Sequence, residues 1–190
     1  MAEANRHGTP PLRRREDSLP HSPNAGRRGP VPTRRNVEDT GDPYLPNHTH
    51  PGKAVCRECQ AVFHDDRWSL DPAAREKALR GGGVQYVTCP ACQKIRDRVP
   101  GGLFTLSGDF VAEHREEILN LIRNEDMRAR NVNPLERVME ISEEGSEMVV
   151  TTTNEKLAQR LGRAVHRAYG GHVEYQWLAD AKQARVRWSR

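Results

Sequence analysis

The chain has 190 residues, of which 35% are hydrophobic and 5% aromatic, and its formal net charge is +4. Both fractions are low for a single packed core of this length, so we expect one or two small domains. No stretch approaches the roughly 20 apolar residues of a membrane span, and the N-terminus lacks the apolar run of a secretory signal. The sequence therefore favours a cytoplasmic protein without a membrane partner.

Residues 1–52 are predicted to form a disordered arm. Residues 1–50 contain eight prolines, eight arginines and no Phe, Trp or Lys, so they cannot bury enough apolar surface to offset the entropy of ordering. Within residues 1–35 the eight arginines stand against three acids, which gives a local charge of +5. Such an arm can follow the phosphates of an RNA, and it can equally be a solubilising tail. Its candidate RNA-binding residues are Arg13, Arg14, Arg15, Arg27, Arg28, Arg34 and Arg35.

Residues 53–100 are predicted to be a zinc-ribbon module. All four cysteines of the chain lie here, in the C-x-x-C pairs Cys56–Cys59 and Cys89–Cys92. Two such pairs supply the four thiolates of a closed tetrahedral site for a structural Zn²⁺, which leaves no open position for a substrate or an activated water. The gap between the pairs exceeds the usual ~15–20 residues, so we expect an inserted element.

Four cysteines can also form disulfides, a redox site or an iron–sulfur cluster. Two disulfides would require an oxidising compartment, and a thioredoxin-type pair would require a βαβ unit that the pattern lacks. An iron–sulfur cluster also uses four cysteines and stays open as an alternative. His64 follows the first pair and is a further candidate ligand, although a solvated histidine beside Asp65 and Asp66 is the simpler interpretation.

The inserted element is predicted to be a short helix over residues 71–80, capped by Asp71 and ended by the three glycines 81–83. Residues 60–63 and 84–88 favour strands on either side. The apolar core of such a module is too small to fold without its metal, so metal binding and folding should be coupled.

A basic run follows the last cysteine. Lys94, Arg96 and Arg98 lie beside the predicted metal site and are candidate RNA contacts, since zinc knuckles with adjacent cations bind RNA. The alternative for this run is an ordinary solvated strand or turn.

Residues 101–133 are predicted to hold a short strand over 103–106 and an amphipathic helix that runs from Ser107 or Asp109 to about Arg130. Residues 131–134 should break this helix and mark a domain boundary.

Residues 134–190 are predicted to form a ββαββ domain, in which a helix packs on one face of an antiparallel sheet. Strands are expected over 135–142, 148–153, 172–178 and 184–188, and a helix over 155–169. The overall fold class is therefore α+β.

Cations line one edge of the predicted helix 155–169. Lys156, Arg160, Arg163 and Arg167 follow i, i+4, i+7, i+11 spacing, and no acid of the helix interrupts that edge. Aligned cations repel one another, so folding alone would not select them, whereas a phosphate backbone would. A solvated basic face is the alternative. Arg185 and Arg187 of the last strand are candidate extensions of the patch.

Motifs for catalysis are missing from the sequence: it has no phosphate-binding glycine loop, no H-E-x-x-H and no G-x-S-x-G. We therefore expect no enzyme activity and no small-molecule substrate. The net charge alone argues weakly for RNA, because four thiolates and one Zn²⁺ would lower it to about +2.

The order of these elements resembles the N-terminal half of the large-ribosomal-subunit export adaptor family, the nonsense-mediated-decay protein "three" group. The similar segments are residues 56–59, 88–98, 106–110 and 150–158, and small single-chain zinc proteins built on this pattern are more similar still. The resemblance implies four zinc-binding cysteines and ribosome binding, mainly to large-subunit RNA. Family members usually carry further cysteines and β domains, so nuclear export is not implied.

These observations predict a non-enzymatic, zinc-binding, ribosome-associated factor that contacts ribosomal RNA during assembly, quality control or quiescence (hibernation). A protein–protein adaptor with a structural zinc module is the principal alternative. A redox or metal-responsive switch is the third.

Overall fold

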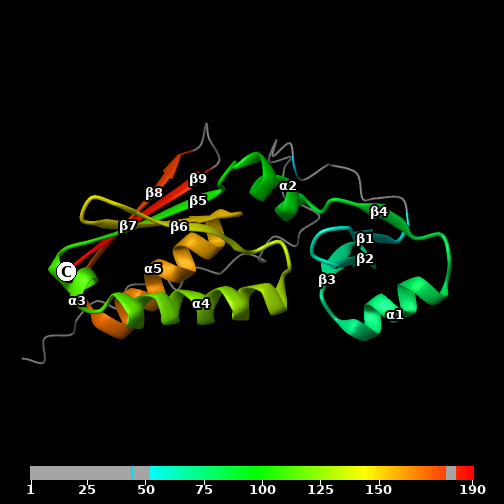
Figure 1. Cartoon of the computed structure of the whole chain (residues 1–190), viewed down its shortest axis with the longest axis horizontal. Helices are drawn as coiled ribbons and strands as arrows, with labels where there is room; N and C mark the ends of the chain where they lie inside the picture. The colour runs from blue at the N-terminus through cyan, green and yellow to red at the C-terminus, as the bar shows by residue number, and fades with distance from the viewer. Residues whose placement is uncertain (1–43, 45–51, 179–182) are drawn as a thin grey trace, which may run out of the picture. The chain divides into compact units, whose positions relative to one another are not determined.

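The structure is a computed structural model that describes Tyr44, residues 52–178 and residues 183–190 (Figure 1). The predicted disordered arm lies outside the described residues except for Tyr44 and Gly52. All its candidate RNA-binding arginines are outside them, and so are residues 179–182. The described residues form a mixed α+β fold with one four-stranded and one five-stranded sheet, which confirms the predicted fold class.

The four-stranded sheet belongs to the cysteine-containing module. Its strand order is β3-β2-β1-β4, in which β1 is antiparallel to β2 and parallel to β4. The inserted helix is present as predicted: the Asp71 carboxylate accepts a hydrogen bond from the Ala73 amide at 3.0 Å, and Pro72 opens the first turn. The elements are β1 (Ala54–Cys56), β2 (Val62–His64), β3 (Arg67–Ser69), α1 (Pro72–Arg80) and β4 (Gln85–Val87).

The basic run after Cys92 is helical, so the alternative of an ordinary strand or turn there was wrong. Helix α2 (Pro90–Asp97) begins with Cys89 as its N-cap residue and ends at Arg98, whose φ of 55° lies in the left-handed region. Proline at the first helical position is favoured because its fixed φ suits a helix and its missing amide would have no partner there. The first two residues of α2, Pro90 and Ala91, therefore lie between the two cysteines of the second pair.

The five-stranded sheet extends further back in the chain than predicted. Its order is β6-β7-β5-β9-β8, with β5 antiparallel to β7 and parallel to β9. Strand β5 is thus the central strand, so residues 102–132 share one sheet and one core with residues 138–178 and 183–189. The boundary expected near residue 133 falls inside this packed unit. The strands are β5 (Gly102–Ser107), β6 (Val138–Glu144), β7 (Glu147–Thr152), β8 (His172–Leu178) and β9 (Gln183–Ser189).

Three helices accompany this sheet: α3 (Asp109–Glu113), α4 (Arg115–Val132) and α5 (Glu155–Tyr169). We expected α3 and α4 as one helix, but His114 leaves the helical region at φ −113° and ψ 25°. The break turns Phe110 toward the end of α5 and the last strand, where its ring lies 5.4 Å from that of Tyr169 and 6.0 Å from that of Trp188. None of the described helices is long and apolar enough to cross a membrane.

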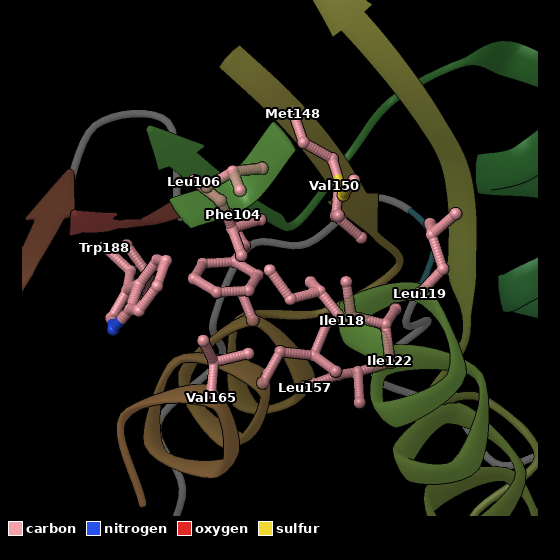
Figure 2. Packing of buried hydrophobic residues seen from close by; sticks show 14 of the residues in the cluster. Phe104, Leu106, Ile118, Leu119, Ile122, Met148, Val150, Leu157, Val165 and Trp188 are labelled. Atoms are coloured by element: carbon pink, nitrogen blue, oxygen red, sulfur yellow. The ribbon is translucent and has the colours of Figure 1, made fainter. Parts of the chain in front are cut away.

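The main core lies between the sheet and helices α4 and α5, which lie on one side of it (Figure 1). Figure 2 shows Phe104 of β5 pointing toward Val165 of α5. Leu106 of β5, Leu157 of α5 and Ile118 of α4 belong to the same cluster of buried residues. Alternate residues of a strand face opposite sides, so the buried side chains of Phe104 and Leu106 place the intervening Thr105 on the other face of the sheet. That second face matters for the candidate RNA contacts below.

Candidate metal centre

The two cysteine pairs meet where strands β1 and β4 run side by side. Cys56 ends β1 and is opposite Val87 of β4 in the parallel register, so Cys89, two residues further on, begins α2 next to it. The amide of Arg57 donates to the Val87 carbonyl at 2.9 Å and holds this junction. The chain then turns through Gln60, at a φ of 63°, and the amide of Cys56 donates to the Ala61 carbonyl at 2.8 Å. This turn aims Cys59 at the second pair.

The four sulfurs are grouped tightly enough to hold one metal ion. All lie within 4.8 Å of one another, with Cys56 Sγ 3.8 Å from Cys92 Sγ and Cys59 Sγ 3.7 Å from Cys89 Sγ. A Zn–S bond of about 2.3 Å implies tetrahedral edges of about 3.8 Å, so the spacing is consistent with zinc. A disulfide needs sulfurs about 2.05 Å apart, and the four cysteines are free.

Arginine 137 contacts this cluster from the loop that precedes β6. Only 7% of its surface is exposed, its Nε donates to the Pro134 carbonyl at 2.8 Å, and its Nη1 donates to Cys92 Sγ at 3.4 Å. A guanidinium is always charged, so burial beside sulfur is favourable only where the sulfur carries negative charge. Sequence reasoning missed this residue, because it lies 45 positions after Cys92 in what was expected to be another domain.

The titration of the thiols also indicates a need for a cation. Hydrogen bonding with Cys89 is the main reason that the pKa of Cys59 is lowered to about 4, and Arg137 lowers it further. The same hydrogen bond and burial raise the pKa of Cys89, and burial raises the pKa of Cys92 to about 12. The protein alone therefore favours the thiolate form of Cys59 and disfavours it at Cys89 and Cys92. A bound divalent cation is what would allow four.

His64 lies outside this four-sulfur cluster. Its Nδ1 is 2.7 Å from the carboxylate of Asp65, and among the residues that the structure describes the group close enough to share an ion contains only the four cysteines. His64 therefore lies beside Asp65, as the simpler interpretation expects, but its side chain is only 16% exposed and not solvated.

The three candidate RNA contacts on α2 are partly engaged within the protein. Lys94 Nζ donates to the Thr153 carbonyl at 3.2 Å, and Arg96 Nε lies 3.1 Å from the Asp97 carboxylate. Arg98 ends the helix and is exposed. Lys94 thus ties the metal module to the second sheet.

The cationic edge of α5 adjoins acids from other elements, which a pattern within one helix could not reveal. Arg160 lies 3.6 Å from the carboxylate of Glu136, a residue that is itself buried. Arg167 borders a cavity of about 580 Å³ between α4 and α5, which Glu117 and Glu125 also line. Lys156, Arg163 and Arg167 are exposed.

The last strand does not extend that edge. Val186 and Trp188 of β9 are buried toward the helices, so Arg185 and Arg187 face the opposite side of the sheet. There Arg187 is opposite Glu174 and Arg185 is opposite Gln176 on β8. The α5 cations and the β9 arginines therefore form two separate surfaces.

Comparison with models of known protein families, with curated proteins and with solved structures finds no match for this chain. Four sulfur donors around one position give a closed site, which organises a fold and offers no vacant coordination position for a reaction.

Proposed function

We propose that this chain is a non-enzymatic, cytoplasmic zinc protein that binds ribosomal RNA, as a ribosome-associated factor in assembly, quality control or hibernation. The observation that carries the proposal is the combination of a four-sulfur cluster with exposed cations on α5. The resemblance to the export adaptor family is the reason to name large-subunit RNA as the partner.

The metal in this proposal is a structural Zn²⁺ held by Cys56, Cys59, Cys89 and Cys92. Their sulfur spacing suits a tetrahedral ion, and thiolates are soft ligands that select zinc over magnesium or calcium. Bound there, the ion supplies folding energy to a module whose own apolar core is small. Arg137 balances part of the negative charge that four thiolates bring.

The RNA contacts in this proposal centre on Lys156, Arg163 and Arg167, which are exposed along α5. Each cation that neutralises a phosphate releases counterions. For each such contact, a tenfold rise in salt concentration should therefore lower the affinity by about 0.7 logarithmic units on a single strand and about 0.9 on a duplex. The arginines of residues 1–35 would add further contacts of the same kind.

The test is sedimentation of the tagged full chain from lysate on sucrose gradients, at low and high salt and with or without RNase. We expect comigration with a ribosomal subunit or whole ribosome that is lost at high salt. A matched pair of variants sharpens the test: Arg163→Gln with Arg167→Gln, against Arg123→Gln with Arg128→Gln on α4. Migration as a small free species in both growing and starved cells would refute the proposal.

A protein–protein adaptor is the second candidate, favoured by the cavity between α4 and α5, whose lining mixes Leu121, Ala164 and Ala168 with charged groups. An interface of that kind depends weakly on salt. Capture of a protein partner that survives high salt and RNase would therefore favour the adaptor.

A further inference from the structure

Two aromatic side chains on strand β8 are unusually exposed. Tyr175 is 47% exposed and Trp177 is 53% exposed, whereas the other tryptophans, Trp68 and Trp188, are 9% and 1% exposed. Large rings are normally buried because they carry much of a core's apolar area. Their exposure here therefore indicates a surface that binds a partner.

The position of β8 explains the exposure. Within the described part of the chain β8 is an edge strand that pairs only with β9, and Tyr175 and Trp177 lie opposite the buried residues Val186 and Ala184. Both rings are therefore on the helix side of the sheet, where α5 packs mainly over β5 and β9. The helix leaves the outermost strand partly uncovered.

The Tyr175 ring packs against α5 one residue before Arg163, a member of the cationic edge. A Cβ added at Gly162 would be 3.5 Å from both Oη and Cε1 of Tyr175, so the tyrosine ring rests against the helix at this glycine. Arg163 is the next residue of the helix, and His166 follows Gly162 by one turn; both are exposed. Glu155 is the only acid in the α5 sequence.

Resting on the proposed RNA-binding function, we propose that Tyr175 and Trp177 form a stacking platform for the bases of single-stranded RNA, with Arg163 holding the adjoining phosphates. Residues i and i+2 of a strand are about 6.8 Å apart, which leaves room for one unstacked base on each ring. Aromatic rings beside a cationic groove are how single strands are bound without sequence preference.

Single-stranded RNA fits this surface better than a second protein strand on the β8 edge. The rings point to the helix side and not along the edge, so edge pairing would still leave their faces open. Arg163, the residue after Gly162, is an exposed cation, which suits a polyanion.

The experiment uses the full chain with a 12-nucleotide oligouridylate and an abasic 12-mer of the same charge. Because Trp177 is the exposed tryptophan, its fluorescence reports on stacking. We expect quenching by the oligouridylate, and affinity about 5- to 100-fold weaker in Trp177→Ala or Tyr175→Ala. Trp177→Phe should retain most of the affinity. Tyr86→Ala, which removes an equally exposed ring from β4, is the matched control and should change nothing.

The abasic 12-mer should bind wild type and Trp177→Ala alike, because both keep the same cations. The proposal is overturned if Trp177→Ala and Tyr175→Ala bind oligouridylate within twofold of wild type while Arg163→Gln binds more weakly. In that case phosphate binding, and with it the proposed function, would stand. If wild type binds no RNA, both fall. A change from dimer to monomer in Trp177→Ala with unaltered RNA affinity would assign the rings to a protein interface instead.

Discussion

Replacing Arg137 with methionine keeps much of the buried aliphatic stem and removes the guanidinium. Two hydrogen bonds are lost, from Nη1 to Cys92 Sγ at 3.4 Å and from Nε to the Pro134 carbonyl at 2.8 Å. A hydrogen bond that involves a charged group stabilises a protein by about 1.5–3 kcal/mol, and a neutral partner left unpaired costs about 1 kcal/mol or more. The free energy of unfolding of the metal-loaded protein should therefore fall by about 2–4 kcal/mol.

The substitution should also weaken metal binding, because mutating a residue that hydrogen-bonds to a metal ligand typically lowers metal affinity by about 10- to 100-fold. The assay is competition for Zn²⁺ against a chromophoric chelator, with thermal unfolding of the loaded protein alongside. Arg128→Met is the control, since Arg128 is an exposed arginine paired with Glu125 on α4. Zinc affinity of Arg137→Met within twofold of wild type would refute the reasoning about charge balance at the cluster.

Three further substitutions have expected outcomes. Cys56→Ser should abolish stoichiometric Zn²⁺ binding, measured by metal analysis of purified protein, and unfold the module, measured by loss of amide protection in β1 and β4; retained zinc would contradict the four-sulfur site. Phe104→Ala should destabilise the second sheet by about 3–5 kcal/mol in denaturant titration, because Phe104 is fully buried in the main core. Asn154→Ala should lower the free energy of unfolding by about 1 kcal/mol in the same assay, because the Asn154 side chain accepts a hydrogen bond from the Leu157 amide at 3.0 Å and caps α5. An unchanged denaturation midpoint would show that the cap contributes nothing.

Elements with their own end signals were predictable from the sequence. Helix α1 has Asp71 and Pro72 at its start, and α5 has Asn154 at its start and Gly170 at its end, so both were placed correctly. The hydrophobic alternation of β8 also gave the right bounds. The cysteine cluster followed from spacing alone, because a two-residue gap is a local constraint on where two sulfurs can lie.

Features that depend on contacts between distant segments were not predictable. The central place of β5 results from pairing with β7 and β9, each at least 40 residues away along the chain. Arg137 reaches Cys92 only because the sheet and the cysteine module meet. Arg185 and Arg187 are separated from the α5 cations because the apolar side of β9 faces the helices. The spacing of charges within α5 does not show which face of the sheet that helix covers.

Contacts around Thr153 connect the metal cluster to the helix proposed to bind RNA. Thr153 Oγ1 accepts a hydrogen bond from the Arg137 amide at 2.9 Å, and the Thr153 carbonyl accepts one from Lys94 Nζ at 3.2 Å. The next residue, Asn154, caps α5. Metal-dependent placement of Arg137 and α2 should therefore position the first turn of α5.

We expect that removing zinc with a chelator speeds hydrogen exchange at the Leu157 amide as well as within the cysteine module, while amides between β8 and β9 keep their protection. Arg137→Met should reproduce the change at Leu157 with zinc still bound. If the module unfolds and Leu157 remains protected, the cluster and α5 are independent, and zinc would influence RNA binding only through α2. If Leu157 responds, metal loading sets the geometry of the cationic helix itself.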